Sequence, residues 1–251
     1  MAVNITLFNL KGERLDTPIL TLDGKEVRIL DLRELTKNAG VEFQQGSVQV
    51  HYIGMERELA AMLKLINAGR SLIFDEQLIE PGEYFESSRL EGAWWLPSHK
   101  AEMAIVVSNT TATPLSVTLA ISGIAPKQKE PKVISLLPNE TRVIDAKKLS
   151  DKQGGTLAEA GGISINHTGA PGGLFACALI QEPSVGFSSI IEFRDPLAAK
   201  SSRLDGAGLR IGKVGGEELS QVAVARNLAD GPTTLHGHIV YTANKGGWTR
   251  L

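Results

Sequence analysis

Two histidines near the carboxyl end of the chain, His236 and His238, have a spacing that can serve metal binding. Side chains at positions i and i+2 of a β-strand point to the same face, and the sequence around this pair alternates as a strand does. A zinc site needs further protein ligands beside two imidazoles, and the sequence marks none. We therefore interpret both histidines as polar side chains of a strand face and predict no metal site.

The chain has one cysteine, Cys177, inside the apolar run Leu174–Ile180. A single cysteine excludes a disulfide within the chain and a cysteine-cluster metal site. An apolar run buries its thiol, and a buried thiol is a poor nucleophile. The sequence also contains no G-x-S-x-G, H-E-x-x-H or phosphate-loop motif. We therefore predict no catalytic residue, no cofactor and no enzymatic activity, and an enzyme with an unmarked site is the less favoured alternative.

Trp94 and Trp95 form an adjacent aromatic pair. Aromatic side chains supply large contact areas to cores and to binding surfaces alike. One interpretation is a packing contact near a boundary between modules. The sharper one is a surface for a sugar or a protein, which makes Trp94 and Trp95 the candidate platform of a carbohydrate-binding module.

The composition limits the classes of function. Lys and Arg number 26 and Asp and Glu 28, giving a net charge of −2, which argues against general nucleic-acid binding. No apolar run approaches the roughly 18 residues of a membrane span. The first ten residues lack a charged segment followed by an apolar core, so they predict no signal peptide. The 42% hydrophobic content is enough for a folded core.

The chain repeats itself with an offset of 114 residues. Ser87–Ala93 (SSRLEGA) recurs as Ser201–Ala207 (SSRLDGA), and Leu22–Leu35 lies over Leu136–Leu149 in the same order. A period of this size is that of a globular module, whereas solenoid units are shorter. The sequence therefore predicts tandem modules.

Six charged residues recur at matching positions of the repeat. They can bind a ligand in each module, or they can serve internally, as strand-end ion pairs or as arginines bonded to loop carbonyls. We favour the internal role. The residues are Arg28, Asp31, Arg142, Asp145, Arg89 and Arg203.

The elements of each unit read mostly as strands. Segments such as Ser47–Val50 and Gly162–Asn166 alternate apolar and polar residues with period two. Arg57–Ala68 has a helix-favouring composition, but its repeat partner Gly172–Pro183 does not, so we expect strands in both. Short strands separated by turns predict an all-β fold of two tandem antiparallel β-sandwich modules of immunoglobulin-like type.

The phase of the repeat sets the expected domains. Residues 1–88 form a first module that is incomplete, residues 89–203 a second that is complete, and residues 204–251 supply the early strands of a further unit. A partial sandwich leaves apolar faces in water. We therefore expect residues 204–251 to complete the first module, within one chain or across a dimer. A piece cut from a longer array is a compatible alternative.

The repeated pattern resembles tandem β-sandwich repeats in large exported proteins of Acidobacteria-like bacteria. It reads V-x-N-T-x-x-x-P-L-x-V, L-P-x-E-T-R-x-I-D, G-G-I-S-I-x-H-x-G-x-P-G-x-L-x-A and S-S-R-L-x-G-A-G-L. These motifs lie at Val107–Val117, Leu137–Asp145, Gly161–Ala176 and Ser201–Leu209.

The resemblance implies an immunoglobulin-like array at the cell surface or outside the cell, and it transfers no catalytic residue. We therefore expect a structural or adhesive module that contacts a protein or glycan surface, further repeats of its parent protein, or a second copy of itself. A carbohydrate-binding module is the alternative.

Overall fold

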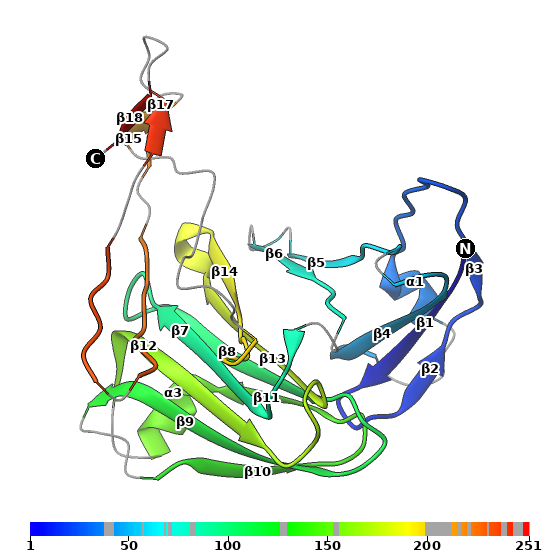
Figure 1. Ribbon diagram of the computed structural model, residues 1–251, viewed down its shortest axis with the longest axis horizontal. Coiled ribbons are helices and arrows are strands. Elements are labelled where there is room, and N and C mark those ends of the chain that lie inside the picture. The colour runs from blue at the N-terminus through cyan, green and yellow to red at the C-terminus, as the bar shows by residue number, and fades with distance from the viewer. Residues whose placement is uncertain are drawn as a thin grey trace.

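A computed structural model describes residues 1–37, 43–56, 58–67, 69, 72–80, 84–125, 130–152, 156–198, 212–214, 217–219, 222–229, 231–236, 240–242 and 248–250. Within them the chain is built of antiparallel sheets with a few short helical segments, as Figure 1 shows. The predicted all-β class is confirmed. The immunoglobulin-like type and the internal repeat stay predictions, and Ser201–Ala207 with Arg203 lie outside the described residues.

The N-terminal sheet is built around its first strand, β1 (Ala2–Asn9). Its antiparallel partners are β2 (Arg14–Asp16), β3 (Leu20–Thr21) and β4 (Gly46–Ile53). Val3, Ile5 and Leu7 alternate along β1 and form its apolar cluster, and Thr6, Phe8 and Asn9 are buried too. A short helix, α1 (Leu32–Thr36), precedes β4. This sheet therefore buries one small apolar face.

Two four-stranded sheets form a β-sandwich in the middle of the chain (Figure 1). The first sheet has the order β10-β9-β12-β7 and consists of β7 (Arg89–Trp95), β9 (Leu115–Ala125), β10 (Lys132–Leu136) and β12 (Thr156–His167). The second has the order β11-β8-β13-β14 and consists of β8 (Glu102–Asn109), β11 (Thr141–Asp145), β13 (Leu174–Glu182) and β14 (Phe187–Glu192). The chain changes sheet at most connections, and helix α3 (Ala146–Lys152) makes one of them.

The two parts differ in the size of their cores. Among the described residues, 24 buried side chains form one cluster in the sandwich, against three in the N-terminal sheet. The run at Cys177 lies in β13, where six of the nine residues are buried and the other three are partly buried. The sandwich therefore holds most of the apolar surface that stabilises the fold.

A hairpin joins the N-terminal region to the sandwich. Its strands are β5 (Met62–Asn67) and β6 (Leu72–Gln77). The Ser188 hydroxyl in β14 donates to the Ile73 carbonyl at 2.8 Å and accepts from the Ile73 N–H at 3.2 Å. The predicted strand within Arg57–Ala68 is confirmed in β5, although its composition favours helix.

The loop after β1 contacts the turn before β11. The Thr141 N–H donates to the Leu10 carbonyl at 3.2 Å. Gly12 has a φ of 81°, and a side chain there would overlap the Pro138 carbonyl. This position therefore needs glycine both for its conformation and for the close approach of two backbones.

The described parts of the carboxyl-terminal region form two hairpins and a loop (Figure 1). The hairpin strands are β15 (Gly212–Val214), β16 (Glu217–Leu219), β17 (Val240–Thr242) and β18 (Trp248–Arg250). Residues 222–229 and 231–236 run beside the sandwich at β7 and β12 in Figure 1. The helices among the described residues are too short to cross a membrane.

Candidate functional site

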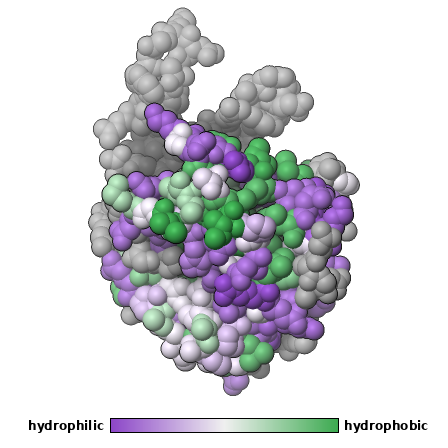
Figure 2. Space-filling view, turned by 90° about the vertical axis from the view of Figure 1, so that its right-hand side faces the viewer, coloured by the Kyte–Doolittle hydropathy of each residue, from purple (hydrophilic) through white to green (hydrophobic). Residues whose placement is uncertain are grey.

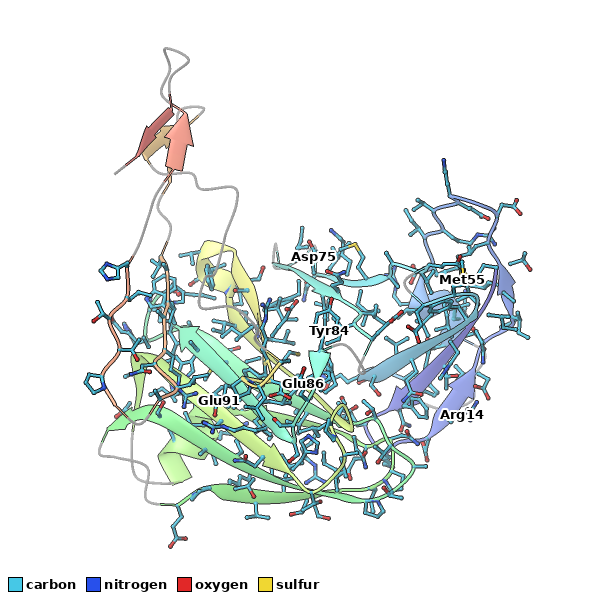
Figure 3. All side chains as sticks on the ribbon, in the orientation of Figure 1. Arg14, Met55, Asp75, Tyr84, Glu86 and Glu91 are labelled. Carbon is cyan, nitrogen blue, oxygen red and sulfur yellow. The ribbon has the colours of Figure 1, made fainter. Side chains whose placement is uncertain are left out.

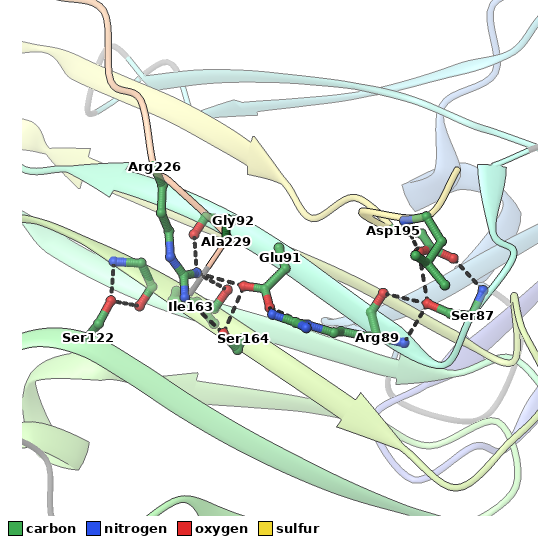
Figure 4. A network of polar contacts seen from close by, with 12 residues as sticks. Ser87, Arg89, Glu91, Gly92, Ser122, Ile163, Ser164, Asp195, Arg226 and Ala229 are labelled. Atoms are coloured by element: carbon green, nitrogen blue, oxygen red, sulfur yellow. Dashed lines mark hydrogen bonds and ion pairs between the residues drawn. The ribbon is translucent and has the colours of Figure 1, made fainter. Parts of the chain in front are cut away.

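A buried cluster of charged side chains surrounds Glu91, in the middle of β7. Its side chain is only 4% exposed. Figure 3 labels Glu91 among the side chains of the sandwich, and Figure 4 shows its polar contacts. One carboxylate oxygen accepts from the Arg89 guanidinium at 2.6 Å. The other accepts from the Ser164 hydroxyl at 2.7 Å and from Arg226 at 2.7 Å. Both oxygens are therefore charge-paired and hydrogen-bonded, as a buried carboxylate requires.

Arg226 reaches this carboxylate from the carboxyl-terminal region, and its side chain is 25% exposed. Besides Glu91, its guanidinium donates to the backbone carbonyls of Gly92 at 3.2 Å and Ile163 at 3.0 Å, and to Ser164 at 2.9 Å. These groups lie on β7 and β12, which are neighbours in the sheet. One arginine thus bonds the tail to two strands of the sandwich.

Gly162 makes room for this contact. A Cβ added there would overlap the Arg226 side chain. Gly162 also exchanges hydrogen bonds with Ser122 of β9, whose hydroxyl accepts at 3.0 Å and donates at 3.2 Å, beside the register shift of β12 (Figure 4). The missing side chain of Gly162 therefore leaves space for the guanidinium beside Glu91 and Ser164.

A second buried acid, Asp195, holds the entry to β7. It is 3% exposed and accepts from the Glu86 N–H at 2.6 Å, from the Ser87 N–H, from the Ser87 hydroxyl at 2.8 Å and from the Leu197 N–H at 2.8 Å. Burial alone raises the pKa of Asp195, but these hydrogen bonds outweigh it and hold the pKa below its ordinary value. Asp195 is therefore a charged structural anchor.

The recurring arginines bond to glutamates within their own turns. Arg28 pairs with Glu26, and Arg142 pairs with Glu140. Each glutamate also accepts from the backbone N–H three residues before it, at Asp23 (2.8 Å) and at Leu137 (2.6 Å). The two turns therefore use the same hydrogen bonds at positions 114 apart.

The recurring aspartates begin the two helices. Asp31 accepts from the Arg33 N–H at 3.0 Å at the start of α1, and Asp145 accepts from the Lys148 N–H at 3.0 Å at the start of α3. The Arg33 side chain, followed by the Arg33 N–H, lowers the pKa of Asp31 to about 2. Arg28 therefore pairs with Glu26 and not with Asp31, and Arg142 pairs with Glu140 and not with Asp145. These residues make internal contacts, but each bonds to another neighbour.

Arg89 pairs with Glu91, as described above, and Arg203 lies outside the described residues. The structure thus brings Arg89 into the buried cluster, and it leaves the other recurring residues at separate turns. Sequence analysis did not single out Glu91, Arg226 or Asp195. The one available signal was that Glu91 recurs as Asp205 inside the strongest repeat match.

The two tryptophans do not form a platform. Trp94 is 1% exposed and belongs to the sandwich core, where its ring packs on Gly161. Trp95, on the opposite face of β7, is partly buried and meets the Phe187 ring edge-on at 6.2 Å. The prediction of a Trp94–Trp95 surface is wrong for Trp94, because a ring inside the core presents no face to a sugar or to a neighbouring module.

Cys177 lies 4% exposed in β13, beside Glu76. Burial, followed by the neighbouring carboxyl groups of Glu76 and Glu192, raises the pKa of this thiol, so it stays protonated. Burial also raises the pKa of Glu76. His236 is exposed outside any strand, and His238 lies outside the described residues. Among the residues that the structure describes, no three His, Cys, Asp or Glu side chains gather as a metal site would require.

Comparison of the chain with protein-family models, with curated proteins and with solved structures finds no match.

Proposed function

We propose that the chain is a non-enzymatic structural or adhesive β-sandwich module of a larger exported or cell-surface bacterial protein. The observation that carries this proposal is that the recurring charged residues bond to groups within their own turns. Glu26 with Arg28 and Glu140 with Arg142 bond inside their own turns, and Asp31 begins a helix. Residues that recur and bond inward are those of a scaffold, since binding residues keep polar atoms free for a ligand.

The proposal includes tandem immunoglobulin-like units with a period of about 114 residues. Two matching turns and two helix starts support the period. Turn residues Lys25 and Asn139, also 114 apart, both have positive φ, of 65° and 56°. A two-sheet sandwich whose chain crosses repeatedly between sheets supports the type of module.

The position of the protein at the cell surface, and its contact with a protein or glycan, rest on the resemblance of the repeated motifs. A rigid sandwich that presents loops and strand edges suits either partner. Trp94 lies in the core, so the two tryptophans do not form a carbohydrate platform.

Mechanical unfolding of the full chain, held between two marker domains in a force spectrometer, tests the scaffold role. Unfolding of the β7–β14 sandwich (residues 89–192) should release about 35 nm of chain in one event, at roughly 3.4 Å per residue. Trp94→Ala should lower the force of that event, and Trp95→Ala should lower it less. Extension without a discrete event of this length would contradict the scaffold role.

A further inference from the structure

A short segment of the N-terminal region, Val27–Asp31, lies outside the helices and strands and has no strand partner among the described residues. It is called the acceptor segment here. Val27 is 89% and Ile29 93% exposed. Apolar side chains in an extended, unpaired segment form an edge that another strand can cover. Figure 2 views the molecule from the side of the N-terminal sheet and shows hydrophobic residues gathered on that surface.

The tail carries a segment of the complementary kind. Val222–Asn227, here called the tail segment, is described without strand pairing, and Val222 and Val224 are 56% and 41% exposed. It ends in a loop in which the Asn227 side chain accepts from the Ala229 N–H at 3.0 Å and donates to the Gly231 carbonyl at 2.7 Å.

The strand β8 ends in the same kind of loop. The Asn109 side chain accepts from the Thr111 N–H at 2.9 Å and donates to the Thr113 carbonyl at 2.7 Å. These are the same hydrogen bonds at positions 118 apart. The tail segment therefore ends as β8 does, and the acceptor segment begins and ends as β11 does, with the same turn and the same aspartate at a helix start.

In the sandwich, β8 and β11 pair with each other. Their antiparallel register sets Val143 opposite Val106 and Asp145 opposite Ala104. The acceptor segment lies 114 positions before β11, and the tail segment lies 118 positions after the matching part of β8. Transferred by these two offsets, the register sets Ile29 opposite Val224 and Asp31 opposite Val222. Directly opposed side chains of antiparallel strands pack together on one face, so the exposed Ile29 and Val224 would cover each other.

We propose that the tail segment of one chain pairs with the acceptor segment of a second copy, in this register, and so joins copies head to tail. This inference rests on the proposed structural role and names its partner. A second copy is favoured because the tail of the same chain is held at Glu91 by Arg226, on the β7–β12 part of the sandwich. Two copies that exchange tails reciprocally close as a dimer about a two-fold axis, whereas one-way exchange builds rings or chains of copies.

The Arg226 contacts then act as a latch on assembly. A tail bound to its own sandwich through Glu91 is not available to a neighbour. Pairing in the new register needs the backbone of the tail segment and its valines, and it does not need the Arg226 guanidinium. Loss of that guanidinium should therefore favour assembly, although it removes an ion pair.

Mixing two single variants of the full chain tests the register between molecules. Ile29→Cys and Val224→Cys should form a disulfide-linked pair under mild oxidation, because directly opposed Cα atoms lie within reach of a disulfide. Ala223→Cys is the matched control, since its side chain points to the other face, and should link several-fold less. The native Cys177 is buried and does not compete.

Three results would overturn the proposal. They are equal linkage with Ala223→Cys, preferential linkage of Ile29→Cys to itself, and an internally linked monomer as the main product of the Ile29→Cys/Val224→Cys double variant. The last would mean that a chain completes its own N-terminal module.

Analytical sedimentation of variants without an introduced cysteine tests whether the Arg226 contacts hold back assembly. Arg226→Ala should raise the fraction of assembled chains, and Val224→Pro, which removes a backbone donor at an exposed position, should leave monomers. No change in either would overturn the proposal. If assembly fails while the mechanical event of the sandwich persists, the assembly alone is wrong; if that event is also absent, the structural role fails with it.

Discussion

The same short motif occurs twice in this molecule, in two different surroundings. Around Glu26 and around Glu140 the chain makes the same turn, the same Glu–Arg pair and the same aspartate helix start. Beyond Glu140 the chain becomes β11 and pairs with β8. Beyond Glu26 it pairs with no strand of the described part of the chain, and Val27 is 89% exposed where the matching Thr141 is 3% exposed. Local sequence thus sets the turn and the helix start, but burial depends on a partner strand.

The largest difference in the free energy of unfolding is expected from an acidic substitution at the matched positions Val27 and Thr141. Thr141→Asp places a charge where the Thr141 hydroxyl now meets that of Ser108 at 2.8 Å in the core, and should cost about 3–5 kcal/mol. Val27→Asp should change the free energy of unfolding by less than about 0.5 kcal/mol at low protein concentration. Calorimetric unfolding measures both. A large loss with Val27→Asp in monomers would mean that the acceptor segment is already paired.

Loss of charge at Glu140 should destabilise the fold more than the same change at Glu26. Glu140 is 8% exposed, and Glu140→Gln leaves the Leu137 N–H and the Arg142 guanidinium more poorly bonded, at a cost of about 1–3 kcal/mol. Glu26→Gln, at the more exposed turn, should cost clearly less. Urea titrations of both variants give the comparison, and equal losses would contradict a difference in surroundings.

Acid should destabilise the fold in part by protonating Glu140. Burial raises the pKa of Glu140, but the hydrogen bonds from Arg142 and Leu137 lower it by more. The net pKa of Glu140 is therefore below its ordinary value. Its contribution to stability is therefore present above the unfolded pKa of about 4.3 and is lost as the pH falls through the lower folded pKa. Glu140→Gln should flatten the fall of stability between neutral pH and pH of about 3. An unchanged pH profile would show that Glu140 is not paired in solution.

The smallest expected effect concerns the turn residues. Lys25 and Asn139 both have positive φ, a conformation that costs most side chains but that asparagine tolerates. Lys25→Gly should therefore stabilise its turn by roughly 0.5 kcal/mol, while Asn139→Gly should be close to neutral. Thermal unfolding of both variants checks this, and the reverse order would contradict the positive φ at Lys25.

Much of the fold followed from local signals. Period-two alternation predicted β4 and the central part of β12, and the strand expected within Gly172–Pro183 is β13. The strand within Arg57–Ala68 followed from comparison with its repeat partner, where composition favoured helix. The burial of Trp94 had a signal that was not used, since Leu90, Gly92 and Trp94 alternate on one face of β7.

The buried cluster could not be predicted from local signals. Glu91 and Arg226 are 135 positions apart in the sequence. Arg226 also donates to the Ile163 carbonyl, and it fits there because Gly162 has no side chain. Such a contact depends on how the tail crosses the sheet. The partners of Arg28 and Asp31 were missed for a different reason: each has an opposite charge two residues away, and a near neighbour costs less chain entropy to pair.

Amide hydrogen exchange of the full chain, compared at low and high protein concentration, tests the central claim most directly. The account predicts slow exchange in Thr141–Asp145 at both concentrations, because β11 pairs with β8 within one chain. It predicts fast exchange in Val27–Asp31 in dilute monomers and protection of that segment, together with Val222–Asn227, when chains associate. Protection of Val27–Asp31 in monomers, or fast exchange there at every concentration, would contradict it.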